Sequence, residues 1–301
     1  MPTTKMHVDE VDIDVELVGQ LLAAQFPQWA GLPIRPVPNW GTDNALYRIG
    51  EDMVARLPRT ERTVGTLEKE RRWLPTLAPH LPLAVPVPLA DGMPGAGYPF
   101  PWSVYRWLRG EDATVRPVAD PSGLASDLAQ FVAALQGIDP AGGPGPGKHN
   151  FFRGEPLAAR DARTRAAIAA LRDVIDVEAA TAAWESALRA PEWQGPPVWI
   201  HGDLDARNLL VGDGRLSAVI DWGCLGVGDP ACDAMVAWKA LAADARDSFR
   251  TTLSIDEATW GRGRGWALSQ AVAALAYYTM ETNPVLVVEA RRWLAEVLAD
   301  Q

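Results

Sequence analysis

Apolar residues recur along this chain with two spacings, and each spacing predicts a different kind of element. Residues 11–25 carry valine and leucine at helical spacing, which predicts a first helix. Short β-prone runs predict three strands, over 40–48, 52–57 and 102–108, the first two joined as a hairpin through Gly50-Glu51. A helix over 66–78 and a proline-punctuated extended segment over 81–89 lie between the second and third strands. The first third of the chain is therefore predicted to be rich in strands.

The other two thirds have mainly helical patterns. These patterns cover 121–135, 157–189 and most of the chain after Pro230, with breaks near Ser254 and Pro284. Three short apolar runs interrupt them as predicted strands, over 198–200, 208–211 and 217–220, and Gly212-Asp213-Gly214 predicts a hairpin between the last two. We therefore predict an α+β fold, with a small β-rich lobe over 1–108 and a larger α-rich lobe over 109–301.

The segment around the predicted hairpin carries the candidate chemistry. Asp203 follows His201-Gly202, Asn208 comes five positions later, and Asp221 comes eighteen positions after Asp203. We expect these three side chains at the ends of neighbouring strands. Phosphoryl transfer needs one carboxylate to orient the attacking hydroxyl and accept its proton, and oxygen ligands to hold Mg²⁺ against the donor phosphates. The alternative is that the carboxylates merely cap turns, which is common for a single aspartate beside glycine.

Three motifs in order resemble the aminoglycoside phosphotransferase and choline kinase family, the small-molecule relatives of protein kinases. They are His201 to Asn208, Ile220-Asp221-Trp222-Gly223, and Gly228 to Asp233. The resemblance implies a protein-kinase-like fold of two lobes with the active site between them. It implies that Asp203 is the catalytic base, that Asn208 and Asp221 bind Mg²⁺, and that His201 supports the loop. Asp229 and Asp233 are expected to brace the loop or to cap the helix that follows them, and not to contact the substrate. Because Gly202 stands where protein kinases carry an arginine, it also implies no phosphorylation switch.

The resemblance extends to a nucleotide site in the first lobe. The segment Trp40 to Tyr47, which includes Asn44, resembles the glycine-poor nucleotide loop of the antibiotic kinases. Arg56 stands where the family has a phosphate-binding cation, and Glu70 fits its expected carboxylate partner, with Glu68 as the alternative. Without the resemblance, Arg56 would be read as an ordinary surface ion pair.

The segment from Trp102 to Gly110 resembles the hinge of that fold. Its main chain would face a purine edge around Arg106 to Leu108, so the donor is expected to be ATP or GTP without a preference between them. Two glycine-rich stretches elsewhere, 141–147 and 261–265, lack the flanking residues of a phosphate-binding or dinucleotide-binding loop.

The composition of the chain restricts the classes of molecule that it is expected to bind. The 301 residues carry a formal net charge of −10, which argues against nucleic acid and is compatible with a cationic small molecule. No apolar stretch is long enough to span a membrane, and the first ten residues lack the apolar region of a signal peptide. Cys224 and Cys232 have no metal-binding spacing and are expected to be reduced thiols of a cytoplasmic protein. The oligomeric state is not specified by any pattern.

The acceptor is the least determined part of the hypothesis. An aminoglycoside is the first choice, because the resemblance is greatest to resistance kinases and the chain is acidic. Four carboxylates are candidates for binding its ammonium groups, although surface charges are their simpler interpretation: Asp205, Asp256, Glu257 and Glu281. A macrolide, a choline-like amine or homoserine are alternatives. A nucleotide-binding pseudokinase without turnover is a further alternative, but all three predicted catalytic-site residues are present.

Overall fold

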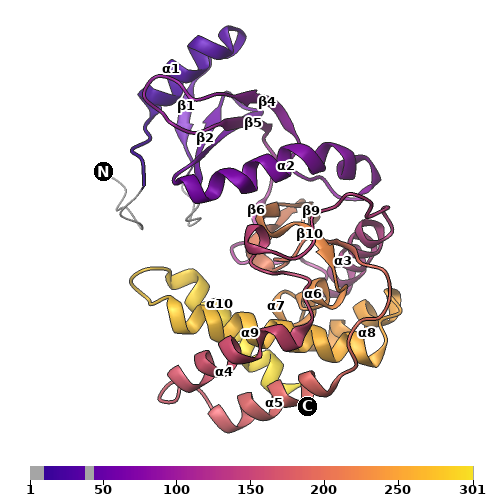
Figure 1. The fold of residues 1–301 in the computed structure, drawn as a ribbon. Coiled ribbons are helices and arrows are strands. Elements are labelled where there is room, and N and C mark those ends of the chain that lie inside the picture. Colours follow the sequence, from indigo (N-terminus) through magenta and orange to yellow (C-terminus); the bar gives the residue numbers. More distant parts are fainter. Residues whose placement is uncertain (1–9, 38–43, 301) are drawn as a thin grey trace. The chain divides into compact units, whose positions relative to one another are not determined.

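The computed structural model describes residues 10–37 and 44–300, which fall into two compact units (Figure 1). The first unit comprises the chain up to Pro79 together with Ala84–Arg109, and the second comprises His80–Leu83 and the chain from Gly110 onward. Each unit is described separately below. No helix in the described ranges has both the length and the apolar character that crossing a bilayer requires.

The first unit is built on an antiparallel sheet. Its five strands lie in the order β1-β2-β3-β5-β4. Their bounds are β1 Ile34–Pro36, β2 Asn44–Ile49, β3 Met53–Pro58, β4 Pro88–Gly92 and β5 Trp102–Arg106. The helices α1 (Val15–Gln25) and α2 (Val64–Leu77) belong to the same unit. Buried residues of α1, among them Leu21 and Leu22, pack with Ile49, Leu57 and Trp102 of the sheet.

The first helix is shorter than predicted. Asp14 has an extended backbone and its Oδ1 accepts a hydrogen bond from Leu17 N at 2.8 Å, so α1 begins at Val15. The backbone N–H of Val11 instead donates to Arg59 O at 3.0 Å. The apolar spacing of residues 11–14 therefore belongs to an extended segment, which periodicity alone does not distinguish from the first turn of a helix.

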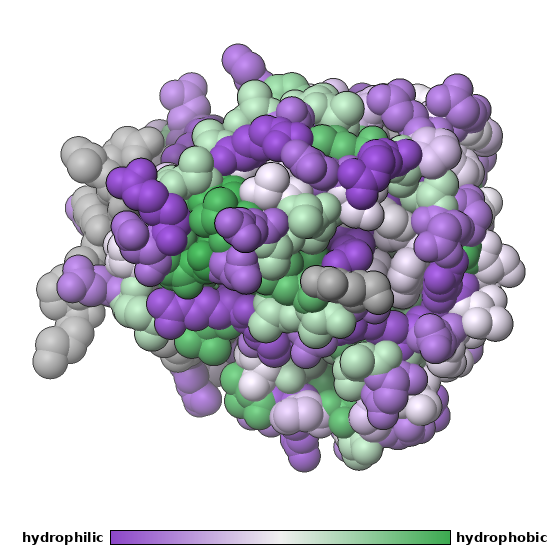
Figure 2. All heavy atoms as spheres, turned by 90° about the horizontal axis from the view of Figure 1, so that it is seen from below, coloured by the Kyte–Doolittle hydropathy of each residue, from purple (hydrophilic) through white to green (hydrophobic). Residues whose placement is uncertain are grey.

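The second unit is mainly helical. Its helices are α3 Pro121–Gln136, α4 Asp161–Ala170, α5 Val177–Arg189, α6 Ala231–Ala234, α7 Val236–Lys239, α8 Ala243–Thr252, α9 Glu257–Tyr277 and α10 Pro284–Ala299. Helix α9 contacts α4, α5, α6 and α10, so it lies at the centre of this unit. On the face seen in Figure 2, hydrophilic residues are interspersed with smaller hydrophobic groups, as expected of a protein surface.

Two small ladders accompany these helices. Strand β8 (Leu209–Gly212) pairs with β9 (Arg215–Val219) and with β6 (Glu111–Asp112), while β7 (Val198–Ile200) pairs with β10 (Gly226–Gly228). The predicted hairpin is confirmed: Asp213 and Gly214 both have positive φ, at 52° and 77°, as a two-residue hairpin turn requires.

One prediction about this unit is wrong. The strand before Asp203 is not a neighbour of the hairpin, because β7 pairs with a glycine-containing strand, β10, that has no apolar alternation to reveal it. The predicted helical pattern over 157–189 is divided between separate helices. It breaks after α4, and α5 begins at the cap formed by Asp176, whose Oδ1 accepts from Ala179 N at 2.9 Å.

Candidate functional site

The loop between β7 and β8 begins at His201, whose imidazole is buried and held on both sides. Its Nδ1 accepts from Asp203 N at 3.2 Å, so the proton lies on Nε2, which donates to Ile220 O at 3.1 Å. The ring also packs against Trp222, with centroids 4.7 Å apart. These contacts tie the loop to the segment that follows β9, and they support the loop-bracing role expected of His201.

Asp233 of α6 also holds this loop, through hydrogen bonds to its backbone. Its two carboxylate oxygens accept from His201 N at 2.7 Å and from Gly202 N at 2.8 Å. Gly202 has a φ of +80°, and a Cβ there would lie 2.6 Å from Cys224 O. The conformation therefore needs glycine, which is a physical reason why no arginine can occupy this position.

Asp203 lies just beyond this anchor, with a quarter of its side chain exposed. Its Oδ1 is 3.3 Å from Lys239 Nζ and 3.9 Å from Arg153 Nη2. Burial by itself raises the pKa of Asp203, but the opposing charges of Lys239, Arg153 and Arg207 hold that pKa well below its ordinary value. The carboxylate is therefore ionised, the form that can accept a proton.

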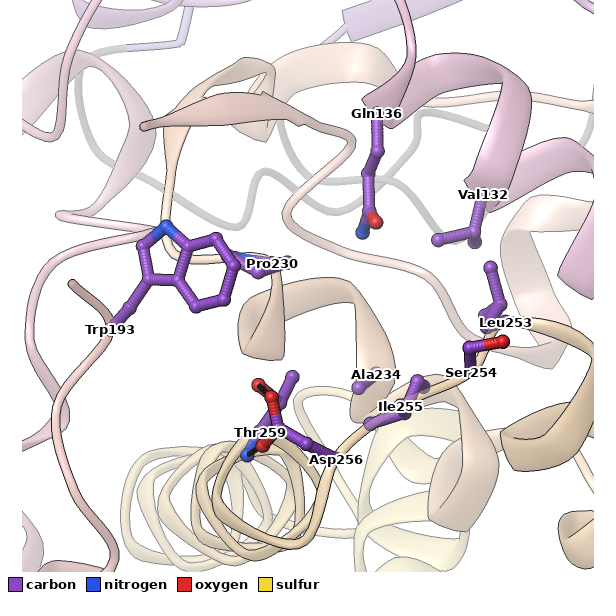
Figure 3. Close-up of a pocket in the computed structure, with 10 residues that line it drawn as sticks. All are labelled: Val132, Gln136, Trp193, Pro230, Ala234, Leu253, Ser254, Ile255, Asp256 and Thr259. Carbon is purple, nitrogen blue, oxygen red and sulfur yellow. Dashed lines mark hydrogen bonds between the residues drawn. The ribbon is translucent and has the colours of Figure 1, made fainter. Parts of the chain in front are cut away.

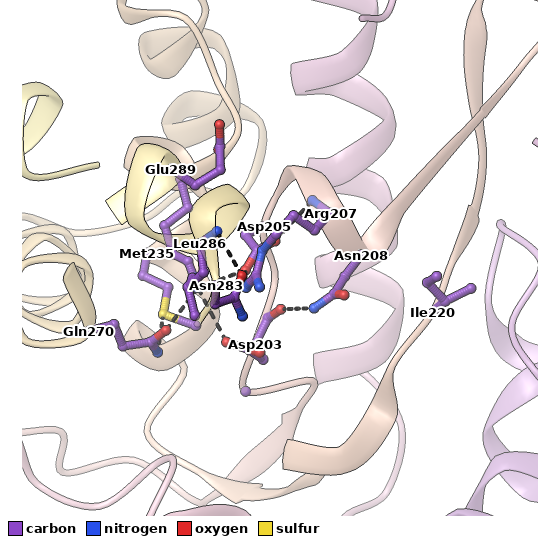
Figure 4. Close-up of polar contacts among 12 residues, drawn as sticks. Asp203, Asp205, Arg207, Asn208, Ile220, Met235, Gln270, Asn283, Leu286 and Glu289 are labelled. Atoms are coloured by element: carbon purple, nitrogen blue, oxygen red, sulfur yellow. Dashed lines mark hydrogen bonds and ion pairs between the residues drawn. The ribbon is translucent and has the colours of Figure 1, made fainter. Parts of the chain in front are cut away.

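Asn208 and Asp221 lie at the open end of the hairpin. Ile220 N donates to Asn208 O at 2.9 Å, which extends the β8–β9 ladder and brings Asp221, the next residue, beside Asn208. Asn208 Nδ2 donates to Asp203 O at 2.8 Å, so its amide oxygen is the atom left to face a cation (Figure 4). Asp221 is exposed and has a left-handed backbone with a φ of 62°.

Amide and carboxylate oxygens are common ligands of Mg²⁺, so the side chains of Asn208 and Asp221 fit the expected ion. The described residues contain no cluster of three or more histidine, cysteine, aspartate or glutamate side chains suited to a metal. Any ion held by Asn208 and Asp221 would thus complete its coordination with water and donor phosphates, as Mg²⁺ commonly does.

Asp229 has other partners than the loop. Its oxygens accept from Arg262 Nε at 2.8 Å and Nη2 at 3.1 Å, and Oδ1 also accepts from Ala231 N at 2.9 Å. This nearly buried pair joins the start of α6 to α9. Asp229 therefore supports the loop only through α6, and Asp233 is the carboxylate that contacts it.

In the first unit, three of the predicted nucleotide-site residues meet. Arg56 Nη1 on β3 lies 2.5 Å from Glu70 Oε2 on α2, and Glu70 is fully buried. The amide oxygen of Asn44, in the orientation that satisfies both groups, accepts from Arg56 Nε and Nη2 at 3.1 Å each. Burial, followed by the Glu70 charge, raises the pKa of Tyr105, whose hydroxyl lies 3.4 Å from Glu70 Oε2. The predicted loop residues 40–43 lie outside the described residues.

The predicted hinge residues lie at and just after the end of β5. Arg106 is the last residue of β5, is exposed and lies opposite Met53, while Leu108 is half-buried. Between them, the backbone N–H of Trp107 donates to Asp52 O at 2.7 Å, so this donor is already hydrogen-bonded within the first unit. Contact of Arg106 and Leu108 with a purine stays a prediction.

Comparison with known proteins identifies the family. Residues 34–266 match the family model described as the phosphotransferase enzyme family, which covers well over half of the chain. The chain belongs to the phosphotransferase enzyme family. No curated protein sequence matches it significantly.

Solved structures of aminoglycoside and macrolide phosphotransferases share the fold. The GDP and kanamycin complex of APH(2")-IIia is 20% identical over 94% of this chain and 99% of its own, with a TM-score of 0.70. The apoenzyme of macrolide 2'-phosphotransferase MphH from Brachybacterium faecium is 24% identical over 92% of this chain and 98% of its own, with a TM-score of 0.62. A type I macrolide 2'-phosphotransferase is 19% identical over 96% and 98%, with a TM-score of 0.63. The predicted α+β, kinase-like fold is thereby confirmed.

Two cations that the sequence did not reveal lie beside Asp203. Lys239, on α7, is fully buried, and Arg153 donates from Nε to Gly202 O at 2.8 Å. No motif marks Arg153. The one available signal for Lys239 was its position as a single charge within the apolar run 234–241, since a buried charge must have partners.

Asp205 cannot bind an acceptor ammonium group as the sequence suggested. It is fully buried, and its oxygens lie 2.6 Å from Arg207 Nη2 and 3.3 Å from Lys239 Nζ. Burial by itself raises its pKa, but Arg207 and Lys239 reverse that effect and lower the pKa below its ordinary value. The negative charge of Asp205 is therefore already paired with cations of the protein itself (Figure 4).

Two other suggested carboxylates are also engaged. Asp256 caps α9 by accepting from Thr259 N at 2.7 Å and Thr259 Oγ1 at 3.1 Å, at the edge of a cavity of about 130 Å³ (Figure 3). Glu257 is exposed and lies 2.5 Å from Arg250 Nη2. The residues lining the cavity include none of the predicted catalytic or metal-binding side chains.

Proposed function

We propose that this protein transfers the γ-phosphate of ATP or GTP to a hydroxyl group of a small molecule. The observation that carries the proposal is the ionised Asp203 carboxylate, held on an anchored loop beside the oxygen donors of Asn208 and Asp221. Membership of the phosphotransferase enzyme family supports the reaction class. The GDP and ADP complexes among the similar structures support a purine nucleotide as donor.

In the proposed reaction Asp203 orients the acceptor hydroxyl and receives its proton. The hydroxyl oxygen then forms a bond to the γ-phosphorus, the bond from that phosphorus to the β,γ-bridging oxygen breaks, and the nucleoside diphosphate leaves. When bound by Asn208 and Asp221, Mg²⁺ would neutralise negative charge on the donor phosphates. Arg56, held by Glu70, would bind phosphate oxygens through its planar guanidinium.

An aminoglycoside-type antibiotic is the first proposed acceptor. The kanamycin and gentamicin complexes among similar structures and the net charge of −10 support it. A macrolide is the second candidate, because Asp205 is buried between two cations and is not available for an ammonium group. The buried thiols of Cys224 and Cys232, which form no disulfide, together with a nucleotide donor, support a cytoplasmic enzyme.

The test is acceptor-stimulated release of ADP or GDP in the presence of Mg²⁺. Aminoglycosides, macrolides and small amino-alcohols are compared with wild-type protein, Asp203→Ala and the matched surface control Asp247→Ala. We expect stimulated release by wild type and Asp247→Ala, and a loss of at least about 10²-fold in Asp203→Ala. Full activity of Asp203→Ala would overturn the assignment. Nucleotide binding without transfer to any acceptor would favour a pseudokinase.

A further inference from the structure

Lys239 is a buried ammonium group placed among three acceptor side chains, two from the loop between β7 and β8 and one from α9. Its Nζ donates to Gln270 Oε1 on α9 at 2.8 Å and lies 3.3 Å from both Asp203 Oδ1 and Asp205 Oδ2. The side chain is fully buried, and Nζ lies 4.4 Å from the ring centroid of Trp293 on α10. The ammonium therefore donates hydrogen bonds to Gln270 and Asp203, pairs with the charge of Asp205, and lies close to the aromatic ring.

Such an arrangement is not expected of a lysine that only adds charge to the surface. A buried ammonium ion loses its hydration, and the fold retains it only where carboxylates and hydrogen bonds replace the lost water. Because helices α7, α9 and α10 and the Asp203 loop all contribute to its surroundings, the ammonium has one position. The ammonium group of Lys239 can consequently fix the position of the loop through its contacts with Asp203 and Asp205.

The contact makes the two oxygens of Asp203 unequal. Oδ1 faces Lys239 and, at 3.9 Å, Arg153, whereas Oδ2 has no hydrogen-bond donor among the residues that the structure describes. An ionised carboxylate that is held by one oxygen presents the other in a defined direction. Oδ2 is therefore the oxygen available to an acceptor hydroxyl.

We propose that Lys239 is a positioning residue for phosphoryl transfer: it holds Oδ1 of Asp203 so that Oδ2 faces the acceptor hydroxyl. This inference rests on the proposed function. Asp205 has the complementary role of holding the ammonium from its other side. Asp205 is in turn oriented by Arg207, whose Nε and backbone N both donate to Asp205 Oδ1, at 3.1 and 2.9 Å.

The proposal is tested with Lys239→Met, which keeps the length of the side chain and removes the ammonium. We expect kcat to fall by about 10- to 100-fold while KM for the nucleotide changes less than about twofold, because a base that is no longer oriented affects the transition state and not nucleotide binding. Arg246→Met is the matched control. Arg246 is a buried cation on α8 that pairs with Glu296 and donates from Nε to Ala237 O on α7, and no contact between it and the Asp203 loop is seen in the described part of the chain. We expect it to lower the melting temperature without changing kcat of the folded enzyme.

A second variant separates positioning from charge balance. In Lys239→Met the buried Asp205 loses one of its two cations, so some destabilisation is expected whatever the role of Lys239. Lys239→Met/Asp205→Asn removes that unbalanced charge. We expect the double variant to regain much of the melting temperature lost in Lys239→Met and to keep the low kcat, because Asp203 still lacks its ammonium partner.

Three results have distinct meanings. Recovery of kcat together with stability in the double variant would overturn the proposal and leave Lys239 as a charge partner of Asp205. Wild-type kcat in Lys239→Met, with Asp203→Ala inactive, would also overturn it while leaving the proposed function intact. Absence of Asp203-dependent transfer in the wild type would overturn the proposed function, and this inference with it.

Discussion

Replacing Asp233 by asparagine tests whether one buried carboxylate holds the catalytic loop. Each of its oxygens accepts one backbone N–H, from His201 at 2.7 Å and from Gly202 at 2.8 Å. Asparagine has almost the same shape but one acceptor oxygen and one NH₂ group. In either orientation of the amide, one of the two N–H groups faces another donor inside the protein.

The size of the expected destabilisation follows from the one backbone N–H group that loses its acceptor. Leaving one buried donor without an acceptor costs about 1–3 kcal/mol. Burial raises the pKa of Asp233, so part of this cost is offset because the neutral amide is less costly to bury than the carboxylate. We expect a net destabilisation of about 2 kcal/mol, which corresponds to a melting temperature lower by about 3 °C, because the entropy of unfolding is about 2.1 cal/mol/K per residue and the chain has 301 residues. kcat should fall as well, since the loop carries Asp203.

Thermal unfolding followed by circular dichroism, with initial rates of phosphoryl transfer, measures both effects. Asp300→Asn is the matched control, because within the described ranges Asp300 accepts one hydrogen bond, from Trp238 Nε1 at 2.7 Å, and an amide oxygen can replace the carboxylate oxygen as its acceptor. If Asp233→Asn melted within about 1 °C of the wild type, the loop would not depend on this carboxylate and the reasoning would be refuted.

Three further outcomes are expected. Arg56→Lys keeps a cation beside Glu70 but loses the planar fork, so KM for the nucleotide should rise by about 3- to 10-fold in initial-rate measurements; an unchanged KM would remove Arg56 from the phosphate site. Asp221→Asn should raise the Mg²⁺ concentration for half-maximal rate by about 10-fold or more, and an unchanged Mg²⁺ titration would contradict its role as a ligand. Burial raises the pKa of the Cys232 thiol far above its ordinary value, so the native chain keeps a proton that the unfolded chain loses. Stability should therefore fall by about 1.4 kcal/mol per pH unit above about pH 8.5, and urea unfolding of Cys232→Ala should lack that part of the slope.

The sequence predicted those parts of the site that are encoded locally. Asn208 and Asp221 flank a hairpin whose Asp213-Gly214 turn is specified by residues that accept positive φ, so their proximity follows from strand pairing alone. The fold class was predictable for a similar reason, because apolar periodicity marks helices and strands without knowledge of their neighbours.

Other features could not be predicted because they depend on contacts distant in sequence. Asp203 follows a strand that pairs with the glycine-containing β10, and no local signal selects that partner over the hairpin. Periodicity also extended the first helix too far, since residues 11–14 have helical spacing but Asp14 caps α1.

The sequence by itself therefore determined the kinase-like motif, the order of Asp203, Asn208 and Asp221, and the fold class. Only the tertiary structure decided how Asp203 is held. Lys239 reaches it from α7, and Asp233 anchors its loop from α6. The physical reason is that the bracing role predicted for Asp233 names no contact atoms, and that a single lysine in a sequence is read as a surface charge. Burial, which makes its partners obligatory, arises only when distant helices pack around it.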